Sequence, residues 1–495
     1  MGGKNVKAFN PVRVFLVLAV VLCAESVQAL SLWDDRVRVN GYLKSQFGVW
    51  LEDQSPYGMG DNAINMLRGT LQIETDVKLT DWAKLYCVFR GVREASYEAE
   101  VGVPDGFYDE EDIREIFLDV DVGEDLHLRI GRQQVVWGEA DYQLILDIIN
   151  PVDMSWHFML EPWEDLRIPN YMLHSFYRLP FLKSSLELIW IPGLDDREDR
   201  VNKLPPSVTA IGRWTPHPTN ISMDLPIPIP LRQNINYKYP NRSLEDSNIG
   251  LRYMFSLGDF EFAIMDYYTF SYAPLPVLKP IALPNDLGGI LDLLVNGITI
   301  DLDMEYPRLN VTGASMNYYW DWVGAVLRLD FAYYWDQPYT AKQLTDMMGT
   351  QSINYFTIEE SDTIKYLVGV DRPSMIRWLN KTTSFMIMGQ FIQTILLDHK
   401  DNMVVTGFDA PIDKIQTFLN FGVTTSYFHA KIAPTVGGMY DFTGGWLIQN
   451  SLEYKPDNNW RINLKSNHIW GHSDFDSVGL FRGKDEFILE LIFQW

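Results

Sequence analysis

Residues 487–495, FILELIFQW, decide the fold class of this chain. Apolar side chains recur there at every second position, at Phe487, Leu489, Leu491, Phe493 and Trp495. In a β-strand, side chains two residues apart share a face, so these five form one stripe about as long as a tilted strand needs to cross a membrane (~9–11 residues). Glu490 and Gln494 point the other way. The pattern is typical of the closing strand of an outer-membrane β-barrel, although an edge strand of a soluble β-sandwich shares it.

The N-terminal 29 residues have the pattern of a secretory signal peptide. Lys4, Lys7 and Arg13 form a basic region, and residues 14–22 form an apolar core that is too short to span a bilayer. Small residues precede a predicted cleavage site at Ala29. We therefore divide the chain into a signal peptide at 1–29 and one barrel domain at 30–495, and we expect localisation to the outer membrane of a Gram-negative cell.

The amino-acid composition of the chain excludes several classes of protein. The net charge is −24, and it becomes −26 once the three basic residues and one acidic residue of the signal are removed, which argues against nucleic-acid binding. No later run of 18 apolar residues predicts a transmembrane helix. Aromatic residues make up 14% of the chain, as suits the aromatic girdles of a barrel. Cys87 is the only cysteine after residue 29, so we expect no internal disulfide, no metal site and no cofactor.

From residue 36 onward, apolar and charged residues alternate with a period of two. Short turns are predicted near 80, 123, 181, 257, 321, 376, 429 and 457, and longer loops lie between them, including 192–246, 272–308 and 336–362. Strict alternation of short turns and long loops is the topology of outer-membrane barrels. The count is about 18 antiparallel strands, with 16 as the alternative; a further candidate at 207–215 breaks the alternation and is assigned to a loop.

The side chains assigned to the lumen have a basic surplus. Eleven are basic and six are acidic; the seven basic residues predicted to set selectivity are Arg68, Lys84, Arg90, Arg129, Arg328, Arg461 and Lys465. Basic rings in a pore favour anions. The alternative is that wall charges pair with one another inside a plugged barrel.

The stretch 134–170, after the fifth predicted strand, is too apolar for a solvated loop. Its part at 139–150 has helical spacing of apolar residues. We predict that it folds inward as a constriction loop whose acids face basic wall residues such as Arg68, Arg90 and Arg129. The alternative is that these acids pair with Arg132 and Arg167. The residues assigned to this loop are Glu139, Asp141, Asp147, Asp153, Asp165 and Arg167.

The same stretch carries a family resemblance. The runs GRQQVVWGEAD (131–141), LDIINPVD (146–153) and EDLRIP followed by NYML (164–173) resemble the signature of the domain-of-unknown-function 1302 family of Gram-negative outer-membrane proteins. The resemblance implies a porin-like barrel without an agreed substrate. It transfers no site residue.

We weigh three functions. The first is a passive channel for small or amphipathic solutes. The second, an enzyme in the barrel wall, needs a nucleophile–base pair that the scattered histidines do not supply, so we do not expect an enzyme. The third is a structural sheath or docking component for an electron-transfer or export partner. Expected partners are outer-membrane lipid, lipopolysaccharide and the barrel-assembly machinery; a homo-oligomer is left open.

Overall fold

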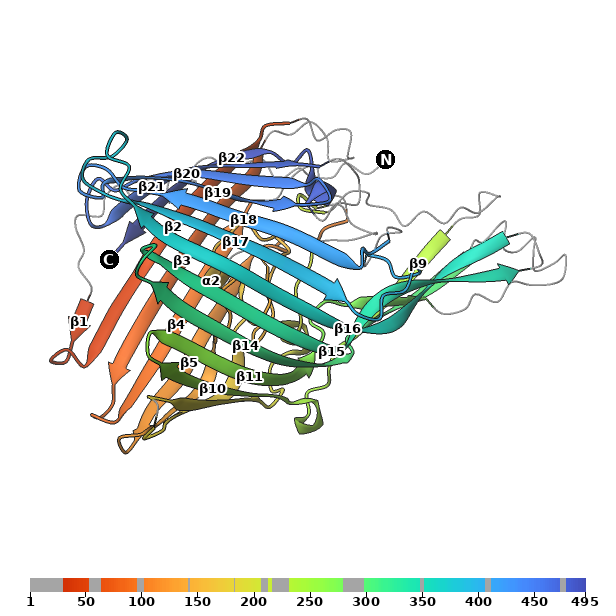
Figure 1. Ribbon diagram of the computed structural model, residues 1–495, viewed down its shortest axis with the longest axis horizontal. Helices are drawn as coiled ribbons and strands as arrows, with labels where there is room; N and C mark the ends of the chain where they lie inside the picture. The colour runs from red at the N-terminus through yellow and green to blue at the C-terminus, as the bar shows by residue number, and fades with distance from the viewer. Residues whose placement is uncertain are drawn as a thin grey trace.

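The computed structural model describes residues 30–52, 64–95, 102–140, 143–181, 183–205, 212–215, 231–278, 298–347, 351–405, 411–471 and 478–495. Within these ranges, eighteen antiparallel strands form one closed sheet (Figure 1). The prediction of 18 strands is therefore confirmed over the alternative of 16. The barrel strands are β2 (Val37–Trp50), β3 (Ile64–Lys78), β4 (Ala83–Glu94), β5 (Glu110–Val122), β6 (Leu126–Gln133), β7 (Asn170–Arg178), β8 (Ser185–Ile191), β10 (Asn248–Leu257), β11 (Phe260–Phe270), β14 (Arg308–Trp320), β15 (Ala325–Met347), β16 (Gln351–Ser374), β17 (Phe385–Leu396), β18 (Ile415–Thr424), β19 (Ile432–Asp441), β20 (Trp446–Tyr454), β21 (Trp460–Trp470) and β22 (Glu486–Gln494).

The terminal strand closes the barrel, as its alternation predicts. β22 pairs with β2 in antiparallel register from Tyr42↔Gln494 to Trp50↔Glu486. The last residue extends the pairing, because the Trp495 amide donates to the Gly41 carbonyl at 3.0 Å. Phe487 is exposed on the outside, whereas its neighbour Ile488 is fully buried on the inside. Period-two alternation thus sorts this strand into an outer and an inner face.

The two ends of the barrel differ. We call the end with the short connections, such as the one between β5 and β6, the turn end, and the other the loop end. Exposed tryptophans ring both: Trp82, Trp322 and Trp378 lie at the turn end, and Trp190 and Trp470 at the loop end. Exposed apolar residues of the strands lie between the rings. An apolar band between two aromatic belts is the outer surface expected of a barrel in a lipid bilayer.

The loop prediction at 336–362 is wrong. β15 and β16 pair almost to their tips and run far beyond the other strands, toward the right of Figure 1. The register shifts between Tyr334 and Gln337, and Asp336 has a left-handed φ of +46°. This bulge adds local twist, and the hairpin leaves the wall at that point. Backbone pairing continues beyond the bulge because the two strands of the hairpin satisfy each other's backbone hydrogen bonds.

A second, small sheet lies within loops that the sequence left unstructured. It consists of β12 (Leu275–Leu278), β13 (Ile298–Glu305) and β9 (Leu231–Lys238), and β13 pairs with β9 in parallel. β12 contacts β15 and β16 of the long hairpin. Of the candidate strand at 207–215, Gly212–Thr215 is a turn region with Arg213 and Trp214 at its centre, and the rest lies outside the described residues.

The remaining elements are short. They are β1 (Leu30–Leu32), which pairs with the start of β2, the helix α2 (Trp163–Leu166), and the 3-10 turns η2 (Arg197–Arg200), η3 (Leu244–Asp246) and η4 (Gly479–Phe481). None of the helices in the described part of the chain is long and apolar enough to cross a membrane. The predicted signal peptide at 1–29 lies outside the described residues and stays a prediction.

Candidate solute pathway through the barrel

The segment 134–170 folds into the barrel, as predicted. Its apolar half buries Val135, Trp137, Ile145, Leu146 and Ile149 to 7% exposure or less. These side chains pack against inward-facing residues of β7, β8, β11 and β14–β17 in one apolar cluster. Burying one large apolar side chain is worth about 1.5–3 kcal/mol. This cluster therefore anchors the segment to one half of the wall.

The helix expected at 139–150 is absent from the described residues of that range. The backbone there is irregular, and side chains satisfy it instead of a helical ladder. The Val135 amide donates to Asn150 Oδ1 at 2.8 Å, and Asn150 Nδ2 donates to the Ile168 carbonyl at 3.0 Å. The Glu139 amide donates to Asp330 Oδ2 of the wall at 2.9 Å. Apolar spacing alone could not distinguish a helix from an extended segment held by the wall.

The polar half of the segment is held by cations from the opposite wall. Asp165, in α2, accepts from Lys44 Nζ at 3.1 Å and from Arg90 Nη1 at 3.1 Å. Arg114 Nη2 donates to the carbonyls of Glu164 at 2.8 Å and Arg167 at 2.8 Å. Burial alone would raise the pKa of Asp165, but the charges of Lys44 and Arg90 hold it below its ordinary value. Asp165 is therefore ionised at neutral pH.

Arg114 is a site residue that sequence reasoning missed. Strict alternation from Glu115 would place Arg114 on the outer face. The register between β4 and β5 shifts at Val88/Phe89, so that Val88 pairs with Glu115 and Phe89 pairs with Ile113. Arg114 is the extra residue of this β-bulge and is only 8% exposed, whereas Ile113 faces out. The bulge places two consecutive charged residues on the inside.

Two further predicted wall residues contact the folded segment. Arg68 lies with its guanidinium 3.8 Å from the ring centre of Trp156, and it pairs with Glu94 at 3.5 Å. Arg328 pairs with Glu139 at 3.7 Å and with Asp371 at 2.5 Å. Arg68, which was expected to face acids of the segment, thus contacts it through the ring of Trp156. Arg328, which was not assigned to face the segment, binds one of its acids.

The other predicted residues lie elsewhere. Arg129 pairs with Asp119 of the neighbouring strand at 2.7 Å. Lys465 pairs with Glu490 at 3.1 Å. Lys84 is exposed near the turn end, and Arg461 lines a cavity described below. Their roles in selectivity stay predictions.

Most of the described acids of the segment are paired, but among them the alternative holds only for Asp147, whose partner is Arg167. Glu139 and Asp165 pair with cations of the wall instead. Arg167 binds Asp147, with a second contact at 3.0 Å, but Arg132 pairs with Asp112 and Asp199 outside the segment. Asp153 accepts from the amide and hydroxyl of Ser155. Asp141 lies outside the described residues.

A buried histidine also fixes the segment. His157 contacts Glu161 at 2.8 Å through Nδ1 and Glu486 of β22 at 2.6 Å through Nε2. Burial alone would lower the pKa of His157, but Glu486 and Glu161 raise it to about 9. The imidazolium thus bridges two carboxylates at neutral pH. No local sequence pattern marks this site, because residues 157 and 486 lie 329 positions apart.

Three cavities follow one another through the barrel. The vestibule, about 880 Å³, lies at the loop end and includes Trp156, Tyr237 and Tyr306 in its lining. A turn-end cavity of about 490 Å³ shares Arg114 and Asp165 with it. A third cavity of about 360 Å³ shares Glu161 and Lys465 with the second and is otherwise rich in amides from β17–β21. Asp165 and Arg114 therefore form the septum between the two ends.

The folded segment and the loops change the charge of this route. The vestibule has five basic and seven acidic lining residues: Arg68, Arg90, Arg114, Arg132 and Lys203 against Asp109, Glu110, Asp112, Asp153, Asp165, Glu198 and Asp199. The turn-end cavity has four and six: Lys44, Arg114, Arg461 and Lys465 against Glu74, Glu115, Glu161, Glu164, Asp165 and Glu490. Acids thus outnumber bases in the lining of both cavities, whereas the sequence predicted a basic surplus for the wall strands.

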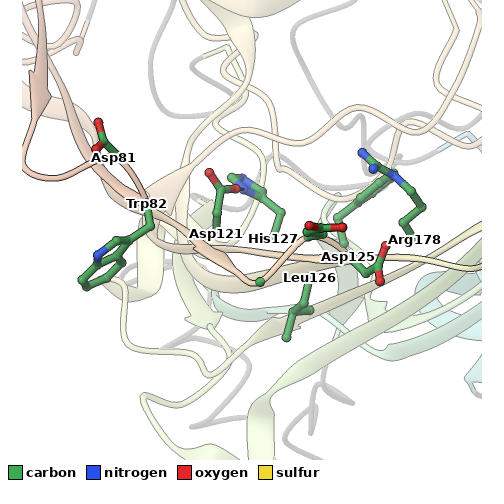
Figure 2. A pocket seen from close by; sticks show the side chains of 10 residues that line it. Asp81, Trp82, Asp121, Asp125, Leu126, His127 and Arg178 are labelled. Carbon is green, nitrogen blue, oxygen red and sulfur yellow. Dashed lines mark hydrogen bonds and ion pairs between the residues drawn. The ribbon is translucent and has the colours of Figure 1, made fainter.

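A fourth hollow, of about 660 Å³, lies on the turn-end rim (Figure 2). It is lined by residues of the β3–β4 and β5–β6 connections and of the neighbouring strand ends, among them Asp81, Asp125 and Arg178. Asp121 and His127 face each other there at 2.8 Å. This hollow shares no lining residue with the three cavities of the interior, so we do not include it in the route.

One family model matches this chain in sequence, and several solved structures resemble it. A search among curated proteins finds no match. Among solved structures, OccAB1 and OccAB3 of Acinetobacter baumannii are 8% and 9% identical, with TM-scores of 0.47 and 0.46. The matches cover 95% and 93% of this chain and 99% of each of those chains. Pseudomonas aeruginosa OccK2, in complex with glucuronate, is 7% identical with a TM-score of 0.46, covering 94% of this chain and 99% of its own. Residues 89–494 match the family model described as "Protein of unknown function (DUF1302)", and the chain belongs to this family.

Proposed function

We propose that this protein is a constricted outer-membrane channel for small amphipathic solutes. The observation that carries the proposal is the succession of cavities from loop end to turn end, with Asp165 and Arg114 as the shared boundary. A solute would enter from the extracellular loop end, cross this septum and leave through the turn-end cavity into the periplasm. The mixed lining of the vestibule, with tyrosine and tryptophan beside charged groups, suits a solute that has both apolar and polar parts.

The charges along the route point to a mild preference for cations. The basic surplus on the wall predicts an anion-selective pore, but the acids that line both cavities outnumber the bases. Rings of acidic side chains favour cations in a pore. The net charge of the whole chain, −24, acts in the same direction at long range. The sheath alternative has less support, because residues 134–170 occupy space that an enclosed partner would need.

Cysteine accessibility in planar bilayers tests the route. In a Cys87→Ser background, Glu164→Cys places a thiol on the turn-end cavity, and Glu245→Cys places one on an exposed turn outside the cavities. A positively charged methanethiosulfonate reagent should lower the single-channel conductance of the Glu164→Cys protein and leave the Glu245→Cys protein unchanged. Equal responses of the two, or a wild-type barrel without conductance, would contradict the proposal.

A further inference from the structure

Three tyrosines form a stack in the wall of the vestibule. The rings of Tyr237 and Tyr239 lie 5.4 Å apart at an interplanar angle of 9°, and those of Tyr239 and Tyr306 lie 5.6 Å apart at 18°. The parallel pairing of β9 with β13 creates the stack, because it sets Tyr237 beside Met304, two residues before Tyr306. Tyr306 is buried and Tyr237 is 43% exposed. The stack therefore has a buried end at Tyr306 and an exposed end at Tyr237, whose ring is accessible from the vestibule.

Among the described residues, the Glu198 carboxylate is the one that acts on the charge state of this stack. Glu198 of η2 is exposed and lines the same vestibule. It has neither an ion-pair nor a hydrogen-bond partner among the residues that the structure describes. Burial and the charge of Glu198 together raise the pKa of Tyr237, and they raise that of Tyr239 to about 12. The phenols therefore stay neutral, and their rings keep the negative face that attracts cations.

The cations of the vestibule are already compensated by other acids. Arg132 pairs with Asp112 and Asp199, and Lys203 pairs with Asp199 at 3.1 Å. Arg68, Arg90 and Arg114 also have carboxylate partners, which are Glu94, Glu110 and Asp165. The negative charge of Glu198 is thus not neutralised by these cations. It shares the vestibule with the aromatic rings and with an apolar surface that includes Pro274, Pro276 and Leu302.

We propose that the vestibule binds an organic ammonium ion with an apolar body. Its positive head lies between the Glu198 carboxylate and the exposed ring of Tyr237, and its body packs against Pro274, Pro276 and Leu302. A carboxylate supplies charge, and an aromatic face supplies the cation–π attraction that favours alkylammonium over strongly hydrated inorganic cations. The inference rests on the proposed channel function and names its solute class. The acidic loops would also concentrate such cations at the mouth.

Calorimetric titration of the full-length barrel in a non-ionic detergent tests the site. The probes are benzyltrimethylammonium, benzyl alcohol and benzoate, which share a ring and differ in charge. We expect the ammonium to bind at least fivefold more tightly than either of the others. Glu198→Gln should remove that advantage, and Tyr237→Leu should weaken the ammonium while leaving benzyl alcohol unchanged. The matched control Glu245→Gln removes a carboxylate from an exposed turn that lines no described cavity, and it should bind like wild type.

Equal affinity for the three probes, or the same loss in Glu198→Gln and Glu245→Gln, would overturn the site. The channel itself is judged separately, by conductance in the absence of any probe. A conducting barrel that does not distinguish the probes refutes the ammonium site alone. A barrel that never conducts refutes the channel, whatever it binds.

Discussion

The septum residue Asp165 allows a quantitative prediction about ion selectivity. Asp165→Asn removes one negative charge where the two end cavities meet and leaves Lys44 and Arg90 with an excess of positive charge. At about 4 Å, one unit charge is worth about 1 kcal/mol in water and about 4 kcal/mol at an effective dielectric constant of about 20. Even the lower value changes the relative permeability of a cation roughly fivefold. We therefore expect the cation-to-anion permeability ratio to fall at least fivefold.

Reversal potentials across a tenfold gradient of potassium chloride measure this ratio. The control is Glu164→Gln, which removes the same charge one residue away, lines only the turn-end cavity and does not touch Lys44 or Arg90. Its effect should be clearly smaller. Because breaking a buried pair costs about 3–5 kcal/mol, intact folding of each variant is first checked by gel mobility with and without heating. If a folded Asp165→Asn barrel keeps the wild-type ratio, or matches Glu164→Gln, Asp165 does not control the route.

Three other predictions concern stability and are measured by urea denaturation followed by tryptophan fluorescence. The pKa of His157 is about 9, against about 6.5 for a free imidazole, so its bridge stabilises the folded barrel fully below pH 6.5 and this stabilisation is lost as pH rises through 9. His157→Gln should therefore lower the free energy of unfolding by about 3 kcal/mol at pH 6 and by little at pH 10. An equal loss at both pH values would refute the bridge. Lys484 is fully buried, and burial lowers its pKa to about 7, so stability rises with pH between about 7 and 10.5, and Lys484→Met should stabilise at pH 6 but not at pH 11; a pH-independent effect would contradict this. Gly131→Ala should destabilise by several kcal/mol, because an added Cβ would lie 2.2 Å from the Ile116 carbonyl at a φ of +141°; Gly69→Ala, where the Cβ meets open space, is the control.

The barrel was largely predictable from the chain because it depends on a local signal. Alternation with a period of two requires only neighbouring residues, and the cost of a charge in lipid forces the apolar face outward. FILELIFQW, the strand count and the short turns follow from that rule. Inward folding of 134–170 was predictable for a related reason, since its apolar residues need a buried surface.

The tertiary structure decided how the interior is arranged. A one-residue bulge turns Arg114 inward against the alternation, and no local pattern marks that residue. His157 meets Glu486 only because strand closure brings distant positions together. The charge of the route depends on which acids reach the lumen from loops, and the tyrosine stack depends on a parallel pairing of two loop strands. Sequence periodicity determined the wall, because lipid excludes charge from the outer face of every strand and so leaves the same local pattern in each. Long-range pairing determined the pathway, because its contacts join segments that lie far apart in the chain.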